Sequence, residues 1–139
     1  MARIRAAEWE TENYWLKRIS AYLAGEASPQ KALAPRVVYI ALADDQVAGF
    51  IAGHLTRRLQ CEGELEWINV AAPWRGAGIA PELLRRLAAW FAAHNALKIC
   101  VDPDDRARSF YLDHGARPLN RHWLVWDDIR ALMAPAAPA

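Results

Sequence analysis

The chain has 139 residues, with 17 basic and 16 acidic side chains and a formal net charge of +1. This length suits a single domain with a substantial core, and the balanced charge does not favour a nucleic-acid partner. No apolar run reaches the ~20 residues that cross a bilayer, and no apolar leader follows the first residues, so we expect a cytoplasmic protein without a membrane partner.

The N-terminal segment predicts a short strand followed by a helix. Residues 3–6 alternate between polar and apolar side chains, as a strand does. Residues 8–23 carry apolar side chains at helical spacing and are followed by Gly25, a typical helix stop. The acidic start of this helix, Glu8, Glu10 and Glu12, suits a helix N-terminus. It would also suit the rim of a site for a cationic substrate.

A hairpin is predicted next, after a loop at residues 27–30 and a short helical turn. Residues 37–42 and 47–55 are rich in β-formers and flank a turn at Asp44 and Asp45. Gly49 and Gly53 leave little side-chain bulk on part of one face of this hairpin. His54 lies in the second strand, where it is either a structural imidazole or a catalytic one.

Residues 64–70 predict the strand that leads into the central motif. Neither side of this strand is uniformly apolar, because the apolar positions change parity between Trp67 and Ile68. Such a change indicates a β-bulge.

A proline and two glycines then separate this strand from a helix, which is the outline of an anion site. Gly76 and Gly78 allow positive φ and a close approach of the backbone to a ligand, and the start of the helix offers unpaired N–H groups. A Rossmann loop would need a small residue where Pro81 stands, and the chain has no Gly-Lys-Ser/Thr of a P-loop. Phosphate is the expected ligand.

The second half of the chain predicts helix, strand, helix and strand. Residues 81–94 form a leucine-rich amphipathic stripe, and residues 97–101 a strand, the order of a parallel crossover. Asp104 and its neighbours offer N-cap oxygens to a helix over residues 106–114. A last strand is expected within residues 117–127. We expect residues 1–130 to form one domain and residues 131–139, alanine and proline, to form a flexible tail.

Two motifs in this order resemble the GNAT family of N-acetyltransferases. The first is the run Val70-x-x-Pro73-x-Arg75-Gly76-x-Gly78-Ile79-Ala80, similar to the acetyl-CoA loop of that family. The second, residues 104–116, is similar to the family's Asn-x-x-Ala-x-x-x-Tyr-x-x-x-Gly helix, with Asp104 in place of Asn. The resemblance implies a mixed α/β fold whose mostly antiparallel sheet is splayed at an acetyl-CoA slot and flanked by helices.

The resemblance also implies a set of site residues. Backbone amides near Ile68 and Val70 would hold the thioester, and the loop amides the coenzyme diphosphate. Tyr111 would be the general acid for the departing thiolate, unless it is an ordinary core aromatic. The coenzyme site would comprise Ile68, Val70, Arg75, Gly76, Ala77, Gly78, Ile79, Ala80, Asp104 and Tyr111.

Glu66 is the candidate general base, because partial burial on the strand beside the thioester would raise its pKa. It could equally be a solvated or ion-paired glutamate, with Glu64 as a weaker substitute. Four arginines, Arg85, Arg86, Arg106 and Arg108, could meet the 3′-phosphate or simply aid solubility. No histidine cluster indicates a metal, and Cys61 and Cys100 are expected to be buried, reduced thiols.

The predicted function is acetyl transfer from acetyl-CoA to the primary amine of a small molecule, by direct attack in a ternary complex. An acidic acceptor pocket would form if five carboxylates cluster in space: Glu62, Glu64, Glu66, Asp127 and Asp128. The alternatives are a protein or peptide N-acetyltransferase and a non-catalytic acyl-CoA-binding module. Seven tryptophans suit either a bulky core or the interface of a homodimer.

Overall fold

The computed structural model describes residues 1–6, 12–25 and 32–133. Within these ranges six strands form one sheet in the order β1-β2-β3-β4-β6-β5. Neighbouring strands are antiparallel, except β3 and β4, which are parallel. This confirms the predicted fold class and the parallel crossover. The strands are β1 (Ala32–Ala43), β2 (Gln46–Thr56), β3 (Gly63–Val70), β4 (Ile99–Val101), β5 (Arg117–Pro118) and β6 (Leu124–Trp126).

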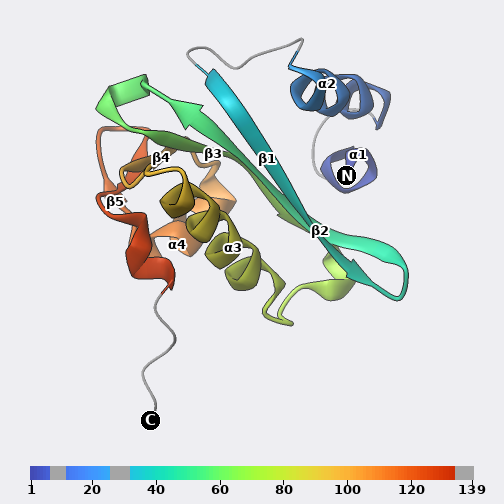
Figure 1. Cartoon of the computed structure of the whole chain (residues 1–139). Coiled ribbons are helices and arrows are strands. Elements are labelled where there is room, and N and C mark those ends of the chain that lie inside the picture. Colours follow the sequence, from blue (N-terminus) through green and yellow to red (C-terminus); the bar gives the residue numbers. More distant parts are fainter. Residues whose placement is uncertain (7–11, 26–31, 134–139) are drawn as a thin grey trace.

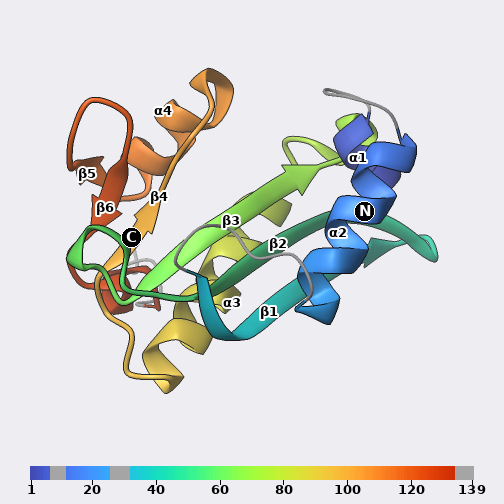
Figure 2. The ribbon, with the colours of Figure 1, turned by 90° about the horizontal axis from the view of Figure 1, so that it is seen from above.

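Helices cover both faces of the sheet (Figure 1, Figure 2). On one face lie α1 (Ala2–Ala6) and α2 (Glu12–Ala24), and on the other α3 (Ile79–Ala93) and α4 (Asp105–Asp113). Each pair of helices buries its own hydrophobic cluster against the sheet. Strand β2 therefore has buried residues pointing both ways, so its sequence is apolar almost throughout rather than alternating.

Glycines allow α3 to pack close to the sheet. A Cβ on Gly53 would lie 3.0 Å from both Leu87 and Phe91, and one on Gly63 would lie 2.5 Å from Phe91. The face of the hairpin where glycines were predicted to leave little side-chain bulk is thus the surface against which α3 packs. Because α3 begins at the coenzyme loop, this packing also fixes where the loop lies.

The predicted bulge exists and lies at Glu66, just before the predicted point. Ala52 pairs with Trp67 and Gly53 pairs with Leu65, which leaves Glu66 as the extra residue of β3. A bulge re-aims side chains, and here Glu66 and Trp67 line the same hollow. The acidic side chain is thereby presented to a cavity instead of the core.

Strands β3 and β4 pair over a short length and then separate. Their pairing runs only from Gly63 to Leu65 on β3 and from Ile99 to Val101 on β4. Beyond Leu65, strand β3 has no β4 partner in the described part of the chain. The strands diverge there, and the gap between them is the splay that the resemblance implied.

Several predicted elements need correction. Residues 3–6 are helical, not a strand, since α1 spans Ala2–Ala6 and its first turn closes on the carbonyl of Met1. Four alternating residues carry too little pattern to outweigh packing against β3. Strand β1 begins at Ala32, where a helical turn was expected. The loop at residues 27–30 and the helix start at residues 8–11 lie outside the described residues.

The C-terminal boundary also shifts. Residues 131–133, expected in the tail, complete a 3-10 helix (Ile129–Met133), and Leu132 packs against the larger core cluster. Residues 134–139 lie outside the described part. The later helices and β4 fall within a few residues of their predicted bounds, with Gly115 at φ +93° after α4. Where one last strand was expected, two short antiparallel strands, β5 and β6, are found. None of the described helices has the length and apolarity to cross a membrane.

Candidate active site

A tight loop joins β3 to α3 and carries the predicted coenzyme residues. A 3-10 turn (Ala72–Trp74) leads to Arg75 and then to Gly76 and Gly78, both at φ +82°. This left-handed backbone favours glycine, and a Cβ at either position would meet no atom within 4 Å. Gly78 precedes α3, whose first N–H groups have no acceptor inside the helix. An open, amide-rich helix start of this kind fits a diphosphate.

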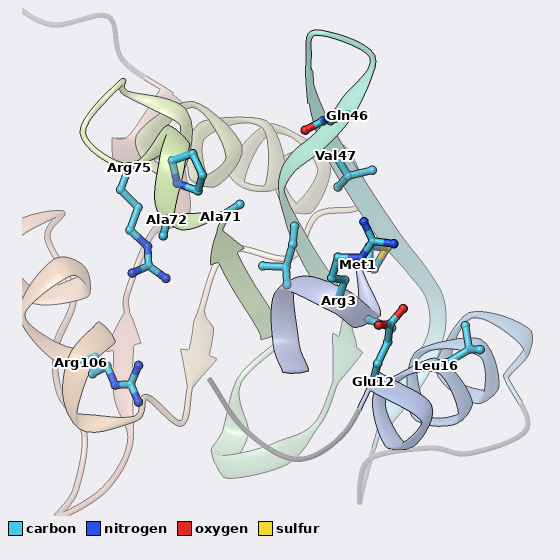
Figure 3. Close-up of a pocket in the computed structure, with 13 residues that line it drawn as sticks. Met1, Arg3, Glu12, Leu16, Gln46, Val47, Ala71, Ala72, Arg75 and Arg106 are labelled. Carbon is cyan, nitrogen blue, oxygen red and sulfur yellow. The ribbon is translucent and has the colours of Figure 1, made fainter. Parts of the chain in front are cut away.

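Two arginines add positive charge beside this loop. The Nε of Arg75 donates to the carbonyl of Val70 at 3.0 Å, which turns the side chain back over the end of β3. Arg106, in the first turn of α4, projects into a hollow that Ala71, Ala72 and Arg75 also line (Figure 3). Both residues also line the slot between β3 and α4. Their guanidinium groups suit phosphate oxygens.

Three other arginines were suggested by the sequence. Arg108 of α4 is not among the residues that line the slot, and the two arginines on α3 form surface ion pairs. Arg85 and Arg86 both pair with Glu82, and all three side chains lie on the exposed face of α3. Of these candidates for the 3′-phosphate, Arg106 is therefore the one that lines the slot.

The slot consists of two adjoining hollows that share Ile68, Asp104 and Ala107. The first hollow lies toward the loop and is lined by Ile68, Asn69, Val70, Arg75, Ala80, Asp104, Arg106, Ala107 and Phe110. The second encloses about 400 Å³ and is lined by residues that include Glu66, Trp67, Asp102 and Tyr111. Five predicted coenzyme residues thus line the first hollow. Both predicted catalytic residues line the second.

The remaining loop residues face elsewhere. Ala77, Gly78 and Ile79 border a separate hollow against β1. The predicted contact of these residues with the coenzyme would therefore be made by their backbone N–H groups at the start of α3, without their side chains.

Tyr111 is buried at the inner end of the second hollow. Its ring packs edge-on against Trp126, with the ring centroids 5.6 Å apart, and only 3% of the residue is exposed. Burial raises the pKa of the Tyr111 phenol, the nearby carboxylate of Asp104 raises it further, and Arg5 opposes both. The hydroxyl therefore keeps its proton at neutral pH.

Asp104 caps α4, as its sequence position predicted. Its Oδ1 accepts hydrogen bonds from the backbone N–H groups of Arg106 and Ala107, each at 2.9 Å. These bonds satisfy two of the N–H groups that the first turn of a helix leaves unpaired. The cap holds the first turn of α4, and with it Arg106, beside the slot.

Glu66 is half-buried beside a second carboxylate. Burial raises the pKa of Glu66 and the negative charge of Glu64 raises it further, whereas His54 and Arg18 lower it. A carboxylate whose pKa is raised toward neutrality can accept a proton from an ammonium group more readily than an ordinary one. A ring nitrogen of His54 and carboxylate oxygens of Glu64 and Glu66 all lie within 4.8 Å of one another. The sequence did not reveal this cluster.

The acidic acceptor pocket considered from the sequence does not form. Asp127 pairs with Arg117 and Asp128 with Arg130, both on the surface. Glu62 accepts hydrogen bonds from the backbone N–H groups of residues 97 and 98. Only Glu64 and Glu66 come together, so the charge pattern alone gave a wrong picture of the acceptor side.

Residues that the sequence did not suggest also build the site. Asn69 is buried, lines the first hollow and accepts a hydrogen bond of 2.5 Å from Nη1 of Arg5. A polar residue in an otherwise apolar strand end was the available signal for Asn69. Arg5 gave no signal, because its partner lies 64 residues away. The prediction of buried thiols is confirmed, since Cys61 and Cys100 are both buried and reduced.

Comparison with known proteins agrees with this geometry. The model of the acetyltransferase (GNAT) family matches residues 2–116. The chain therefore belongs to the GNAT family of acetyltransferases, and its fold and family define an acyltransferase enzyme. No curated protein matches the chain.

Solved structures share the fold at low identity. A GNAT-family acetyltransferase from Desulfovibrio desulfuricans superposes with a TM-score of 0.68 at 15% identity, covering 89% of this chain and 86% of that one. Aminoglycoside 6′-acetyltransferase type Ii gives 0.67 at 17% identity, covering 92% and 86%. The PaiA N-acetyltransferase of Thermoplasma acidophilum, in complex with coenzyme A, gives 0.57 at 15%, covering 82% and 68%. At these identities the likeness shows the fold alone.

Proposed function

We propose that the protein transfers the acetyl group of acetyl-CoA to the primary amine of a small molecule, by direct attack in a ternary complex. The observation that carries this proposal is the joining of the two hollows. Ile68 and Asp104 line both, so the hollow at the coenzyme loop continues into the one that holds Tyr111 and Glu66. A thioester held in the slot would reach the two residues able to move protons.

The chain would hold the coenzyme largely through its backbone. The amides of residues 75–80 and the start of α3 would bind the diphosphate, with Arg75 and Arg106 supplying charge. The edge of β3 beyond Leu65 is unpaired toward β4 in the described residues. Its backbone N–H groups near Ile68 and Val70 would stabilise the negative charge that develops on the thioester oxygen.

Glu66 and Tyr111 would act at different steps of the reaction. Glu66 takes a proton from the ammonium group of the acceptor, which leaves a nucleophilic amine. Tyr111 donates a hydrogen bond to the departing sulfur. A thiol has a pKa of about 8.5, and burial raises the pKa of the Tyr111 phenol. The phenol therefore stabilises the thiolate as a hydrogen-bond donor more readily than it surrenders its proton.

A small-molecule acceptor is favoured by the size of the second hollow. About 400 Å³ is room for a compact amine next to the thioester. A cytoplasmic location and a homodimer remain predictions from the sequence.

The test is the release of coenzyme A thiol from acetyl-CoA across a panel of amines. Small amines, aminoglycosides and lysine peptides should be compared at equal concentration, and we expect turnover with at least one small amine. Turnover restricted to peptides would instead assign protein acetylation. Tight coenzyme binding without turnover on any acceptor would assign a non-catalytic binding module and contradict the proposal.

A further inference from the structure

A buried polar group of four side chains lies behind Glu66, on the α2 face of the sheet. Glu64 is 5% exposed and His54 is fully buried. The Nε2 of His54 lies 3.5 Å from Oε1 of Glu64, and the Nε of Arg58 lies 3.0 Å from the same oxygen. Tyr22, from α2, contacts Nδ1 of His54 at 2.9 Å. The group around Glu64 of β3 thus contains residues of α2, of β2 and of the 3-10 turn that follows β2 (Arg58–Gln60).

Tyr22 and Arg58 hold the side chains at this point. The hydroxyl of Tyr22 shares a hydrogen bond of 2.9 Å with Nδ1 of His54, which fixes the orientation of the imidazole. Oε1 of Glu64 lies 3.5 Å from Nε2 of His54 and 3.0 Å from Nε of Arg58. The carboxylate of Glu64 is therefore held beside the guanidinium of Arg58.

Glu66, the extra residue of the bulge, lies against this carboxylate. The possible ligand atoms of Glu64, Glu66 and His54 lie within 4.8 Å of one another. Two carboxylates so close in a half-buried site resist double ionisation. Since Glu64 is held by His54 and Arg58, the proton goes to Glu66.

We propose that Glu64 is a positioning residue for the general base: with His54 and Arg58 it forms a fixed charge that makes Glu66 the proton-accepting member of the pair. This inference rests on the proposed function. In the step concerned, the acceptor's N–H bond breaks, its proton forms an O–H bond with Glu66, and the electron pair stays on nitrogen. The proton leaves Glu66 for solvent after the product departs.

Other charged groups around the pair include two carboxylates, Asp102 and Asp104, which line the hollow that holds Glu66. Arg18 of α2 and Arg5 of α1 line the hollow that holds Glu66. Arg36 of β1 lies over the ring of Tyr22, with Cζ 4.8 Å from the ring centroid. Arg58 lies over the ring of Trp123 at 4.9 Å, which fixes its guanidinium. These cations lower the pKa of nearby carboxylates. The negative charge of Glu64 opposes them and raises the pKa of Glu66.

The arrangement suits a proton better than a metal ion. His54, Glu64 and Glu66 would offer three ligand atoms, but Arg58 already lies 3.0 Å from the Glu64 oxygen that a metal would need. A divalent cation placed there would face the guanidinium at short range. Binding of Zn²⁺ therefore becomes an outcome that the test can report.

The decisive experiment is the pH dependence of kcat/KM, which reports ionisations of the unliganded enzyme. Glu64→Gln removes the neighbouring charge, so the acidic limb should move down by about one pH unit or more. Arg58→Gln removes a cation and should move the limb up. Glu62→Gln, the same change at an exposed site two residues away, should leave the limb in place. An unmoved limb in both cluster variants overturns the proposal.

A measurement without turnover separates this inference from the proposed function. Infrared difference spectra of the resting enzyme should show a protonated carboxyl band that titrates above the ordinary pKa of a glutamate and is absent in Glu66→Gln. In Glu64→Gln the same band should titrate at lower pH. A band that titrates alike in Glu64→Gln and wild type contradicts the inference even in an active enzyme. Tight Zn²⁺ binding by wild type, lost in Glu64→Gln, would also overturn it in favour of a metal site.

Discussion

The two walls of the slot are built by different means. The coenzyme wall consists of local backbone geometry: glycines at φ +82°, the start of α3 and the cap of α4 by Asp104. The acceptor wall, which holds Glu66, depends on side chains that meet across the fold, such as Tyr22 and His54, which are 32 residues apart. The coenzyme wall can be predicted from short sequence motifs, whereas the acceptor wall depends on residues that the fold brings together.

The largest expected effect is on the coenzyme wall. Gly78→Val places a β-branched residue at φ +82°, where it is strained, and puts side-chain bulk beside the diphosphate site. Affinity for coenzyme A should fall by roughly 100-fold or more, measured by calorimetry. Gly25→Val is the matched control. Gly25 also has positive φ with open space around it, but it lies after α2, so its change should lower stability and leave coenzyme affinity unaltered.

The next effect belongs to the point where the walls meet. Tyr111→Phe removes the phenol and keeps the ring against Trp126, so kcat should fall by about 100-fold with coenzyme affinity within about twofold. Steady-state kinetics and calorimetry separate these two readouts. Tyr39→Phe is the control, since Tyr39 borders the hollow beside β1. A wild-type kcat in Tyr111→Phe would remove Tyr111 from the mechanism.

The cap of α4 offers a smaller and more local test. Asp104→Ala loses both N–H contacts and should lower the free energy of unfolding by about 1 kcal/mol. Asp104→Asn keeps an accepting oxygen, so its stability should stay near that of wild type. It also removes a negative charge near the diphosphate and should tighten coenzyme binding about threefold. Urea unfolding and calorimetry measure the two effects. Weaker binding by Asp104→Asn would contradict this assignment.

The smallest effect concerns the stability of the acceptor wall. The folded pKa of Glu66 is raised above its unfolded value. The wild type therefore loses stability as pH rises from the ordinary glutamate pKa through that raised value. Glu66→Gln does not titrate, so its stability relative to wild type should improve as the pH rises through this window. Thermal melts at several pH values measure the difference. A relative stability that falls with rising pH would contradict the burial of this carboxylate.

The same contrast explains how far the sequence could be interpreted. Gly76, Gly78 and Asp104 act through their own backbone or that of the next few residues, so their roles could be predicted from spacing. The bulge at Glu66 was predictable from a change of parity, to within a residue or two.

Long-range partners could not be predicted in this way. The helix α1 was taken for a strand, because four residues do not define a period and its anchor, Asn69, lies far along the chain. The acidic residues were grouped by charge, yet Asp127 and Asp128 each bind a nearby arginine instead. Charge along a sequence does not report which side chains share a cavity.

The most direct test of the account is a crystal structure of the protein with coenzyme A. The account predicts the diphosphate on the amides of residues 75–80, the pantetheine arm between β3 and β4, and the sulfur at about 3.5 Å from the Tyr111 hydroxyl. A diphosphate bound away from that loop, or a sulfur beyond reach of the phenol, would contradict it.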